Sequence, residues 1–143
     1  MASEGELRLL MEPAPFAVLA THGAGRRLDL VPCCFALDAS AGHPEVVTAV
    51  DHKPKRHKRL ARLVNVERDP NVTLLVDHRD PDDWSQLWWV RVHGLARVVV
   101  AGPEHEAAVA ALARKYAQYR DRPPLGPAIR VTPERWSGWS GRG

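Results

Sequence analysis

Apolar and polar residues alternate over several short stretches of this chain, and a period of two predicts β-strands. The predicted strands cover Phe16–Thr21, Leu28–Leu37, Val46–Val50, Val72–Asp77, Leu87–Val100 and residues 128–132. Pro32 lies inside the second of them, which predicts an edge position or a bulge there. Six strands, few helices and one helical crossover indicate a mainly β fold, a small six-stranded β-barrel with α-helices.

Apolar residues with helical spacing predict three helices between and around these strands. The predicted helices cover Glu4–Met11, Arg56–Glu67 and Pro103–Tyr119. Ser3 and Glu6 have the spacing of a capping box at the start of the first helix. The second helix is expected to end before Pro70, because the residue preceding a proline avoids helical geometry.

The strand Leu87–Val100 has two unlike faces, since successive side chains of a strand point to opposite sides. Its even positions are all apolar and are predicted to face the core. Its odd positions combine aromatic, basic and apolar side chains, among them Trp89 and Arg91. This mixture indicates a subunit interface, where tryptophan and arginine are enriched, or a ligand contact, and both can hold at once.

Size and composition narrow the class of protein. A chain of 143 residues is predicted to form a single domain, residues 1–143. Its apolar fraction of 45% and charged fraction of 26% are ordinary for a soluble globular protein. No apolar run reaches the roughly 20 residues of a membrane span, and the acidic N-terminus does not resemble a secretory signal. We therefore expect a cytoplasmic protein without a membrane partner.

Positive charge is concentrated in one segment, although the net charge of +3 is small. Six lysines and arginines lie between Lys53 and Arg62, and no acidic residue lies between His52 and Val66 to neutralise them. One interpretation is a solvated helix face, which is common for charge runs. The other is a phosphate site at the end of strand Val46–Val50, because lysine and arginine bind phosphate oxygens.

Other chemistries have less support in the sequence. A nucleic-acid partner is not expected, since the basic segment has no aromatic residue for base stacking. The adjacent Cys33 and Cys34 are predicted to be buried thiols, and the scattered histidines predict no metal site. No nucleophile and base pair is recognisable, so no catalytic residue is assigned. His93 could donate a proton, but a single strand histidine is more often structural.

Five motifs follow one another along the chain: VVTAV, the basic segment, RLVNVERDPNVTLLV, WVRVHG and RVTPERWSGW. Their order, from about Phe16 to Trp139, resembles that of the pyridoxamine 5′-phosphate oxidase-like flavoprotein family. The segment from Lys53 to Gly94 is similar to a branch of that family that uses the deazaflavin coenzyme F-420. The resemblance implies a split β-barrel of the FMN-binding type. It also implies a homodimer with two cofactor sites at the subunit interface.

The resemblance further implies which residues bind the cofactor. Basic residues would hold its anionic tail, strand residues would meet its ring system, and the turn after the helix keeps the family spacing. The implied residues are Thr48, Val50, Lys53, Lys55, Arg59, Arg62, Asn65, Trp89 and Arg91. Trp89 stands where the oxidases have a glutamine that reaches the flavin, so this chain departs from the oxidase pattern.

The activity implied by the resemblance is hydride transfer between a reduced deazaflavin and a small organic acceptor. In such enzymes the cofactor carries the chemistry, and the protein positions it and tunes its electronics. Two alternatives remain at this point. One is an FMN-dependent oxidoreductase with the same groove, and the other is a non-catalytic protein that binds or carries the cofactor.

Overall fold

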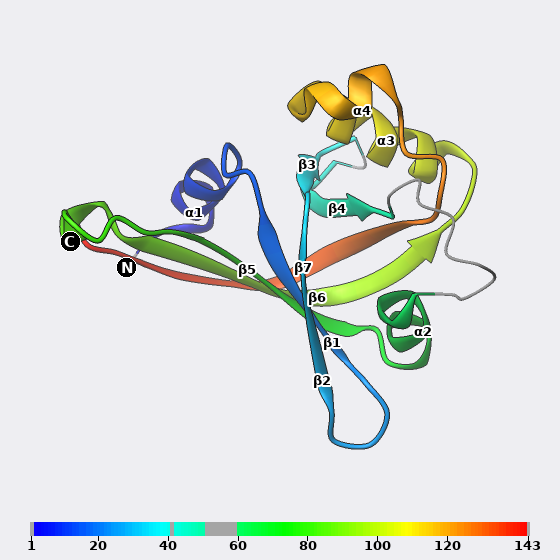
Figure 1. Cartoon of the computed structure of the whole chain (residues 1–143), viewed down its shortest axis with the longest axis horizontal. Coiled ribbons are helices and arrows are strands. Elements are labelled where there is room, and N and C mark those ends of the chain that lie inside the picture. Colours follow the sequence, from blue (N-terminus) through cyan, green and yellow to red (C-terminus); the bar gives the residue numbers. More distant parts are fainter. Residues whose placement is uncertain (1, 41, 51–59, 143) are drawn as a thin grey trace.

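A seven-stranded antiparallel sheet, bent into a half-barrel, dominates the computed structural model, which describes residues 2–40, 42–50 and 60–142 (Figure 1). Its strands are β1 (Ala17–His22), β2 (Leu28–Cys33), β3 (Ala36–Asp38), β4 (Glu45–Ala49), β5 (Asn71–His78), β6 (Trp88–Val99) and β7 (Ala128–Ser140). Their order across the sheet is β2-β1-β5-β6-β7-β4-β3. The long strands β6 and β7 form its centre.

The prediction of six strands was wrong because the expected strand Leu28–Leu37 is two strands at opposite edges of the sheet. The break falls at Cys34 and Phe35. The Phe35 backbone does not continue a ladder: its N–H donates to the Tyr116 hydroxyl at 3.1 Å, and its carbonyl accepts from that hydroxyl at 3.0 Å. The edge position expected from Pro32 is confirmed, since Pro32 lies on β2.

The last strand is much longer than the predicted segment 128–132, because β7 continues to Ser140 and pairs along the whole of β6. A bulge between His93 and Gly94 shifts the register of this pair. A Cβ atom at Gly94 would overlap the Thr132 backbone carbonyl, so glycine permits the close approach of the strands.

The described residues form four α-helices, α1 (Glu4–Met11), α2 (Ala61–Arg68), α3 (Pro103–Lys115) and α4 (Ala117–Asp121), and a short 3-10 helix, η1, at Trp84–Gln86. The cap of α1 is confirmed, since the Glu6 N–H donates to the Ser3 hydroxyl at 3.2 Å. The end of α2 before Pro70 is also confirmed, whereas residues 56–59 of that prediction lie outside the described residues.

The single helix predicted over Pro103–Tyr119 was wrong, because extended backbone at Tyr116 (φ −114°, ψ 122°) separates α3 from α4. The Tyr116 hydroxyl donates to the Pro15 carbonyl at 2.7 Å and also contacts the Phe35 backbone. These hydrogen bonds hold the Tyr116 side chain against Pro15 and Phe35 at the point where α3 ends and α4 begins. In the part of the chain that the structure describes, no helix has the length and apolar character needed to cross a membrane.

Two clusters of buried apolar side chains fill the molecule. The larger lies in the half-barrel and includes the even positions Val90 and Val92 of β6, both 0% exposed, so the predicted core face is confirmed along β6. The prediction was wrong for Val100, which lies beyond the end of β6 and is 64% exposed. The smaller lies between α3, α4 and strands β3 and β4, around Leu112 and Val47. Figure 1 shows β4 beneath α3 and α4, and α2 at the lower right beside β6.

Candidate cofactor site

A cavity of about 200 Å³ lies where β4 ends and α2 begins. Its lining residues come from the ends of β2 and β4, the first turn of α2, helix α4 and the segment before β1. They are Phe16, Pro32, Cys33, Cys34, Ala49, Arg62 and Tyr119. We call this cavity the Arg62 pocket, because Arg62 is its one cationic lining residue among the described residues.

Thr48 and Arg62, two of the residues expected to bind a cofactor, both affect the pKa of the Cys33 thiol. Thr48 is buried with 2% of its surface exposed and makes a side-chain hydrogen bond with the Cys33 thiol. Burial raises the pKa of Cys33, while the Thr48 hydrogen bond and the Arg62 charge act in the opposite direction. The fold therefore brings the end of β4 and the first turn of α2 to one place.

The guanidinium of Arg62 has an unusual electrostatic setting. Within the described residues, it makes no ion pair or hydrogen bond. The described residues lining the pocket include no aspartate or glutamate. An arginine can donate to two oxygens of a phosphate or carboxylate at once, so this position suits an anionic ligand.

Val50 and Asn65 lie close to the same region, but in different environments. The Val50 N–H donates to the Pro127 carbonyl at 3.0 Å, just beyond the end of β4. Asn65 is only 3% exposed. Its amide nitrogen donates to the Thr21 hydroxyl at 3.0 Å and to the Asp29 carboxylate at 2.8 Å. Asn65 thus joins α2 to β1 and β2, and its contact with a cofactor stays a prediction.

Three further expected ligands of the cofactor, Lys53, Lys55 and Arg59, lie outside the described residues. Their assignment stays a prediction that follows from sequence alone. Leu60, at which the described chain resumes, precedes α2 and is half-buried against the larger core cluster.

Trp89 and Arg91 are not part of the Arg62 pocket. They lie on the odd face of β6, where the Arg91 guanidinium carbon is 5.0 Å from the centre of the Trp89 ring. Trp89 pairs with Trp139 of β7, close to the C-terminus. Figure 1 shows this end of the sheet at the left and α2 at the right. Within one chain, therefore, Trp89 and Arg91 lie apart from Arg62, the other expected ligand that the structure places at a cavity.

His93 lies on the same odd face, and its Nδ1 is 2.6 Å from the Thr73 hydroxyl. It lines a cavity of about 300 Å³ with His22, Asn71 and Glu134. Among the residues that the structure describes, no group of three or more histidine, cysteine, aspartate or glutamate side chains is arranged to hold a metal ion.

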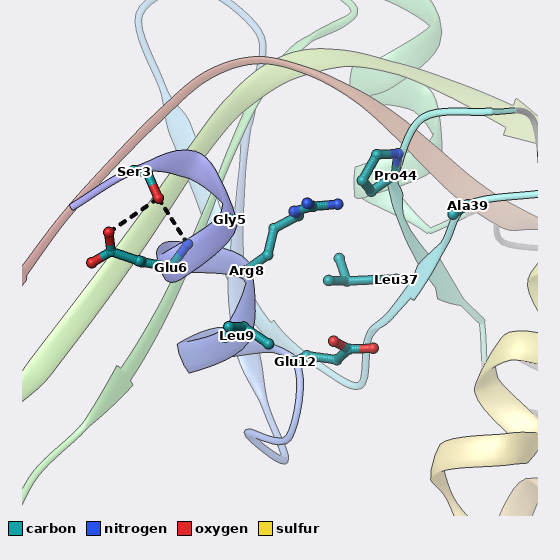
Figure 2. Close-up of a pocket in the computed structure, with 9 residues that line it drawn as sticks. All are labelled: Ser3, Gly5, Glu6, Arg8, Leu9, Glu12, Leu37, Ala39 and Pro44. Carbon is teal, nitrogen blue, oxygen red and sulfur yellow. Dashed lines mark hydrogen bonds between the residues drawn. The ribbon is translucent and has the colours of Figure 1, made fainter.

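A larger cavity of about 560 Å³ lies between α1 and the segment that joins β3 to β4. Figure 2 shows the Arg8 side chain extending from α1 toward Pro44 and Leu37, with Glu12 below it. Two carboxylates, those of Glu6 and Glu12, line this cavity, so its charge is unsuited to an anionic tail. None of the expected cofactor ligands lines it within the described residues.

Of the residues predicted to bind a cofactor, Arg62 lines the pocket, while the thiols that also line it were missed by the sequence reasoning. Cys33 and Cys34 were predicted to be buried thiols, and both are half-buried and line the cavity. Phe16, which is 62% exposed, was also missed. The only signal near them was Pro32, which marked the place where the strand could be interrupted.

Comparisons with known proteins agree with this fold. A sequence model described as pyridoxamine 5′-phosphate oxidase matches residues 3–140. A conserved hypothetical protein from Mycobacterium tuberculosis superposes with a TM-score of 0.76 at 19% identity, covering 99% of this chain and 87% of the other. No functionally curated protein matches the sequence.

Two further solved structures have the same fold. A protein of unknown function from Corynebacterium diphtheriae gives a TM-score of 0.65 at 24% identity, over 96% of this chain and 93% of the other. A protein named as the FAD binding protein from Mycobacterium smegmatis gives a TM-score of 0.62 at 20% identity, over 96% of each chain.

Proposed function

The chain belongs to the pyridoxamine 5′-phosphate oxidase family, and from this premise we propose that it is an oxidoreductase that uses the deazaflavin coenzyme F-420. Its substrate would be a small organic acceptor that takes a hydride. FMN in the same groove is the alternative cofactor.

The observation that carries this proposal is that Arg62 lines a cavity at the end of β4 and has no ion pair or hydrogen bond among the described residues. No described carboxylate neutralises it, whereas Arg130, the buried arginine among the described residues, is paired with Asp38 and Glu45. A cofactor with an anionic tail would supply the missing counter-charge. The basic residues Lys53, Lys55 and Arg59 precede Arg62 closely in sequence and would extend the same positive field along a long tail.

The residues of this chain have limited roles in the proposed reaction. Arg62 would hold the anionic tail, and the backbone near Thr48 and Val50 would lie along the ring system. When bound, the deazaflavin supplies the hydride chemistry, so no protein nucleophile is required. Thr48, buried and hydrogen-bonded to Cys33, keeps the end of β4 in a fixed position against the pocket.

We further propose that the protein acts as a homodimer through the odd face of β6 and the same face of its neighbours, here called the outer face. The strand registers place apolar side chains from five strands on it. The exposed ones are Leu28 (56%), Leu30 (64%), Leu75 (36%), Leu95 (41%) and Trp139 (50%). Exposed apolar patches of this kind commonly mark protein interfaces.

A dimer would also account for the separation of the expected ligands. In one chain, the start of β6, which holds Trp89 and Arg91, lies near the C-terminus at the opposite side of the sheet from α2, which holds Arg62 (Figure 1). A two-fold interface brings the same patch of both subunits together. Trp89 and Arg91 of one subunit would then complete the site that Arg62 forms in the other.

A specific observation favours the flavin alternative over other cofactors. One structural relative is named as an FAD binding protein, so the same fold accommodates a flavin nucleotide there. FMN and F-420 both carry a phosphate on a tail attached to a planar ring. Either would satisfy the charge of Arg62, and the longer anionic tail of F-420 would suit the larger number of basic residues.

The test is a thermal unfolding series of the purified chain with F-420, FMN and FAD. A ligand that binds only the folded state raises the melting temperature by mass action. We expect the largest rise with F-420, followed by oxidation of reduced F-420 in the presence of quinone, nitroaromatic or enone acceptors. A rise with FMN alone would favour the alternative, a rise without turnover would favour a carrier, and no rise with any of them would refute the proposal.

A further inference from the structure

Asn65 is the polar member of the three side chains that α2 buries. Its carboxamide is held from three sides. The amide nitrogen donates to the Thr21 hydroxyl at 3.0 Å and to the Asp29 carboxylate at 2.8 Å. The amide oxygen accepts from the Arg68 guanidinium at 3.1 Å. Asn65, with 3% of its surface exposed, is therefore both enclosed and hydrogen-bonded at each of its polar atoms.

These bonds use both donors of the Asn65 side chain. A carboxamide has two N–H donors, and the anionic tail of a cofactor accepts hydrogen bonds. With Thr21 and Asp29 in place, Asn65 has no N–H left for such a tail. Its oxygen, which carries partial negative charge, would repel the tail. We therefore expect any role of Asn65 in an anion site to be indirect.

The helix that carries Arg62 depends on contacts with the sheet for its position. Helix α2 has only eight residues, and its N-cap, Leu60, makes no side-chain hydrogen bond. Helices shorter than about 12 residues are marginal in water, so packing decides where they lie. Apolar packing has no preferred direction, whereas hydrogen bonds fix direction and distance. Asn65 supplies such bonds from the middle of α2, and Arg68 adds one to the His22 carbonyl at 3.1 Å.

Asn65 also connects Arg62 to another wall of the Arg62 pocket. The two residues are three positions apart on α2, so they are adjacent along the helix. Asp29, which accepts from Asn65, lies on β2, and the end of the same strand supplies Pro32 and Cys33 to the pocket. The bond between Asn65 and Asp29 thus joins the helix that carries the cation to a strand that lines the same cavity.

We propose that Asn65 is a positioning residue of the cofactor site, which fixes Arg62 at the pocket and does not touch the cofactor. This inference rests on the proposed function, in which Arg62 holds the anionic tail. A binding group must be held within about 0.5 Å of its productive position by the residues around it. Loss of the carboxamide would let α2 shift against β1 and β2, and the guanidinium of Arg62 would shift with the helix.

The first measurement uses the ligand-free chain and needs no cofactor. Hydrogen–deuterium exchange followed by mass spectrometry reports local opening, and Asn65→Ala should speed exchange of the α2 amides about fivefold while α3 stays within about twofold of wild type. The matched control is Asn71→Ala, which removes an exposed carboxamide that donates to Asp69 at 2.9 Å in the turn after α2. Unchanged exchange of α2 in Asn65→Ala would overturn the inference, whichever cofactor binds.

The second measurement is the affinity for F-420, by fluorescence titration, in a double-mutant cycle with Arg62→Met. Asn65→Ala alone should weaken binding about fivefold, but less than about twofold in the Arg62→Met background, because changes that act through one residue are not additive. Equal losses in both backgrounds would mean that Asn65 acts on the cofactor independently of Arg62, and would overturn the inference. An unchanged affinity in Asn65→Ala would overturn it as well.

Failure of the proposed function gives a different result. If Arg62→Met keeps the wild-type affinity, the role of Arg62 as the anion ligand fails first, and the inference fails with it. A wild-type chain that binds neither F-420 nor FMN refutes the proposed function, and the exchange measurement then decides whether Asn65 fixes α2.

A second variant covers the case in which Asn65→Ala does not fold. Thr21 is 1% exposed on β1 and does not line the pocket, and valine keeps its shape while removing the hydroxyl that accepts from Asn65. Thr21→Val should weaken F-420 binding about twofold to threefold, and only while Arg62 is present. A Thr21→Val protein with a native circular dichroism spectrum and the wild-type affinity would then overturn the inference.

Discussion

Two arginines near β4, Arg130 of β7 and Arg62 of α2, are in opposite electrostatic situations. Arg130 is 1% exposed and donates to Glu45, the first residue of β4, at 2.8 Å, to Asp38 at 2.6 Å and to the Glu104 carbonyl at 3.0 Å. Beside the end of β4, Arg62 has no partner among the described residues. The comparison teaches that this fold pairs the buried charge that joins its strands, whereas Arg62, which lines a cavity, has no paired carboxylate among the described residues.

The network around Arg130 is extensive. Glu45, 3% exposed, accepts from Arg97 at 3.0 and 3.2 Å and from the Thr132 hydroxyl at 2.7 Å. Arg97 also pairs with Glu104 of α3. These bonds join β3, β4, β6, β7 and α3. Each buried charge has an opposite charge and further hydrogen bonds, which is the condition under which burial of ions is tolerated.

The largest expected effect comes from breaking this network. Arg130→Met leaves the carboxylates of Asp38 and Glu45 buried without their main partner, and we expect a loss of about 3–5 kcal/mol in the free energy of unfolding. Urea unfolding followed by circular dichroism measures it. Arg114→Met, which removes an exposed arginine on α3, is the control and should change the stability by less than about 0.5 kcal/mol. Equal stabilities of the two variants would contradict the role of Arg130.

The second prediction concerns acid. Hydrogen bonds from Arg97, Thr132 and Arg130 outweigh burial and lower the pKa of Glu45 from 4.5 to about 2. A carboxyl group with a lowered folded-state pKa stabilises the fold above its unfolded-state pKa. We therefore expect stability to fall as the pH is lowered from about 4.5 toward 2.

Urea unfolding at pH 7, 4.5 and 3 measures this loss. The matched variant Glu45→Gln has no carboxyl group at this position, so its stability should be lower at pH 7 and should change less between pH 4.5 and 3. A wild-type protein whose stability is the same at pH 7 and pH 3 would show that the network does not depend on an ionised Glu45.

The third prediction concerns the other end of β4. Arg62→Met keeps most of the side-chain volume but removes the charge, and we expect it to weaken cofactor affinity at least tenfold. Charge-assisted bonds contribute about 1.5–3 kcal/mol each. The melting temperature of the ligand-free protein should stay close to wild type, since no described partner loses a bond. Fluorescence titration with F-420 measures affinity, and Arg114→Met is again the control.

The opposite pattern would contradict the contrast between the two arginines. If Arg62→Met destabilises the ligand-free protein by as much as Arg130→Met and leaves the affinity unchanged, then Arg62 is a structural residue. Both measurements on the same two variants decide between these roles.

The smallest expected effect is at the outer face. Trp89→Ala should weaken self-association by about 1 kcal/mol, roughly fivefold, and should weaken cofactor binding with it, because tryptophan contributes strongly at interfaces. Sedimentation velocity over a concentration series measures association. Trp84→Ala, which removes a tryptophan that is 73% exposed on η1, is the control. A monomeric wild-type protein would remove the basis for a shared site.

Local patterns were sufficient for much of the fold. The capping box at Ser3, the end of α2 before Pro70 and the buried even face of β6 were all confirmed. Each depends on neighbouring residues only, through backbone capping, proline sterics or side-chain alternation. The placement of Arg62 on a helix that follows the strand ending near Val50 was also predicted, although the helix begins at Ala61 and not at Arg56 in the described residues.

Errors arose where distant segments meet. The break of the expected strand at Phe35 and the break of the expected helix at Tyr116 share one cause, since the Tyr116 hydroxyl bonds the Phe35 backbone across 81 positions. The extension of β7 to Ser140 depends on the whole length of β6. The pairing of Asn65 with Thr21 and Asp29 likewise joins α2 to strands far away in sequence.

The sequence by itself determined where most strands and helices lie, the core face of the long strand and the concentration of positive charge before α2. Hydrophobic periodicity and local sterics act over a few residues, so they can be followed along the chain. Only the tertiary structure decided which arginines are neutralised, which thiols line the Arg62 pocket and that Asn65 joins α2 to Thr21 and Asp29. Those outcomes depend on distances between remote residues, and the composition of a sequence does not contain these distances.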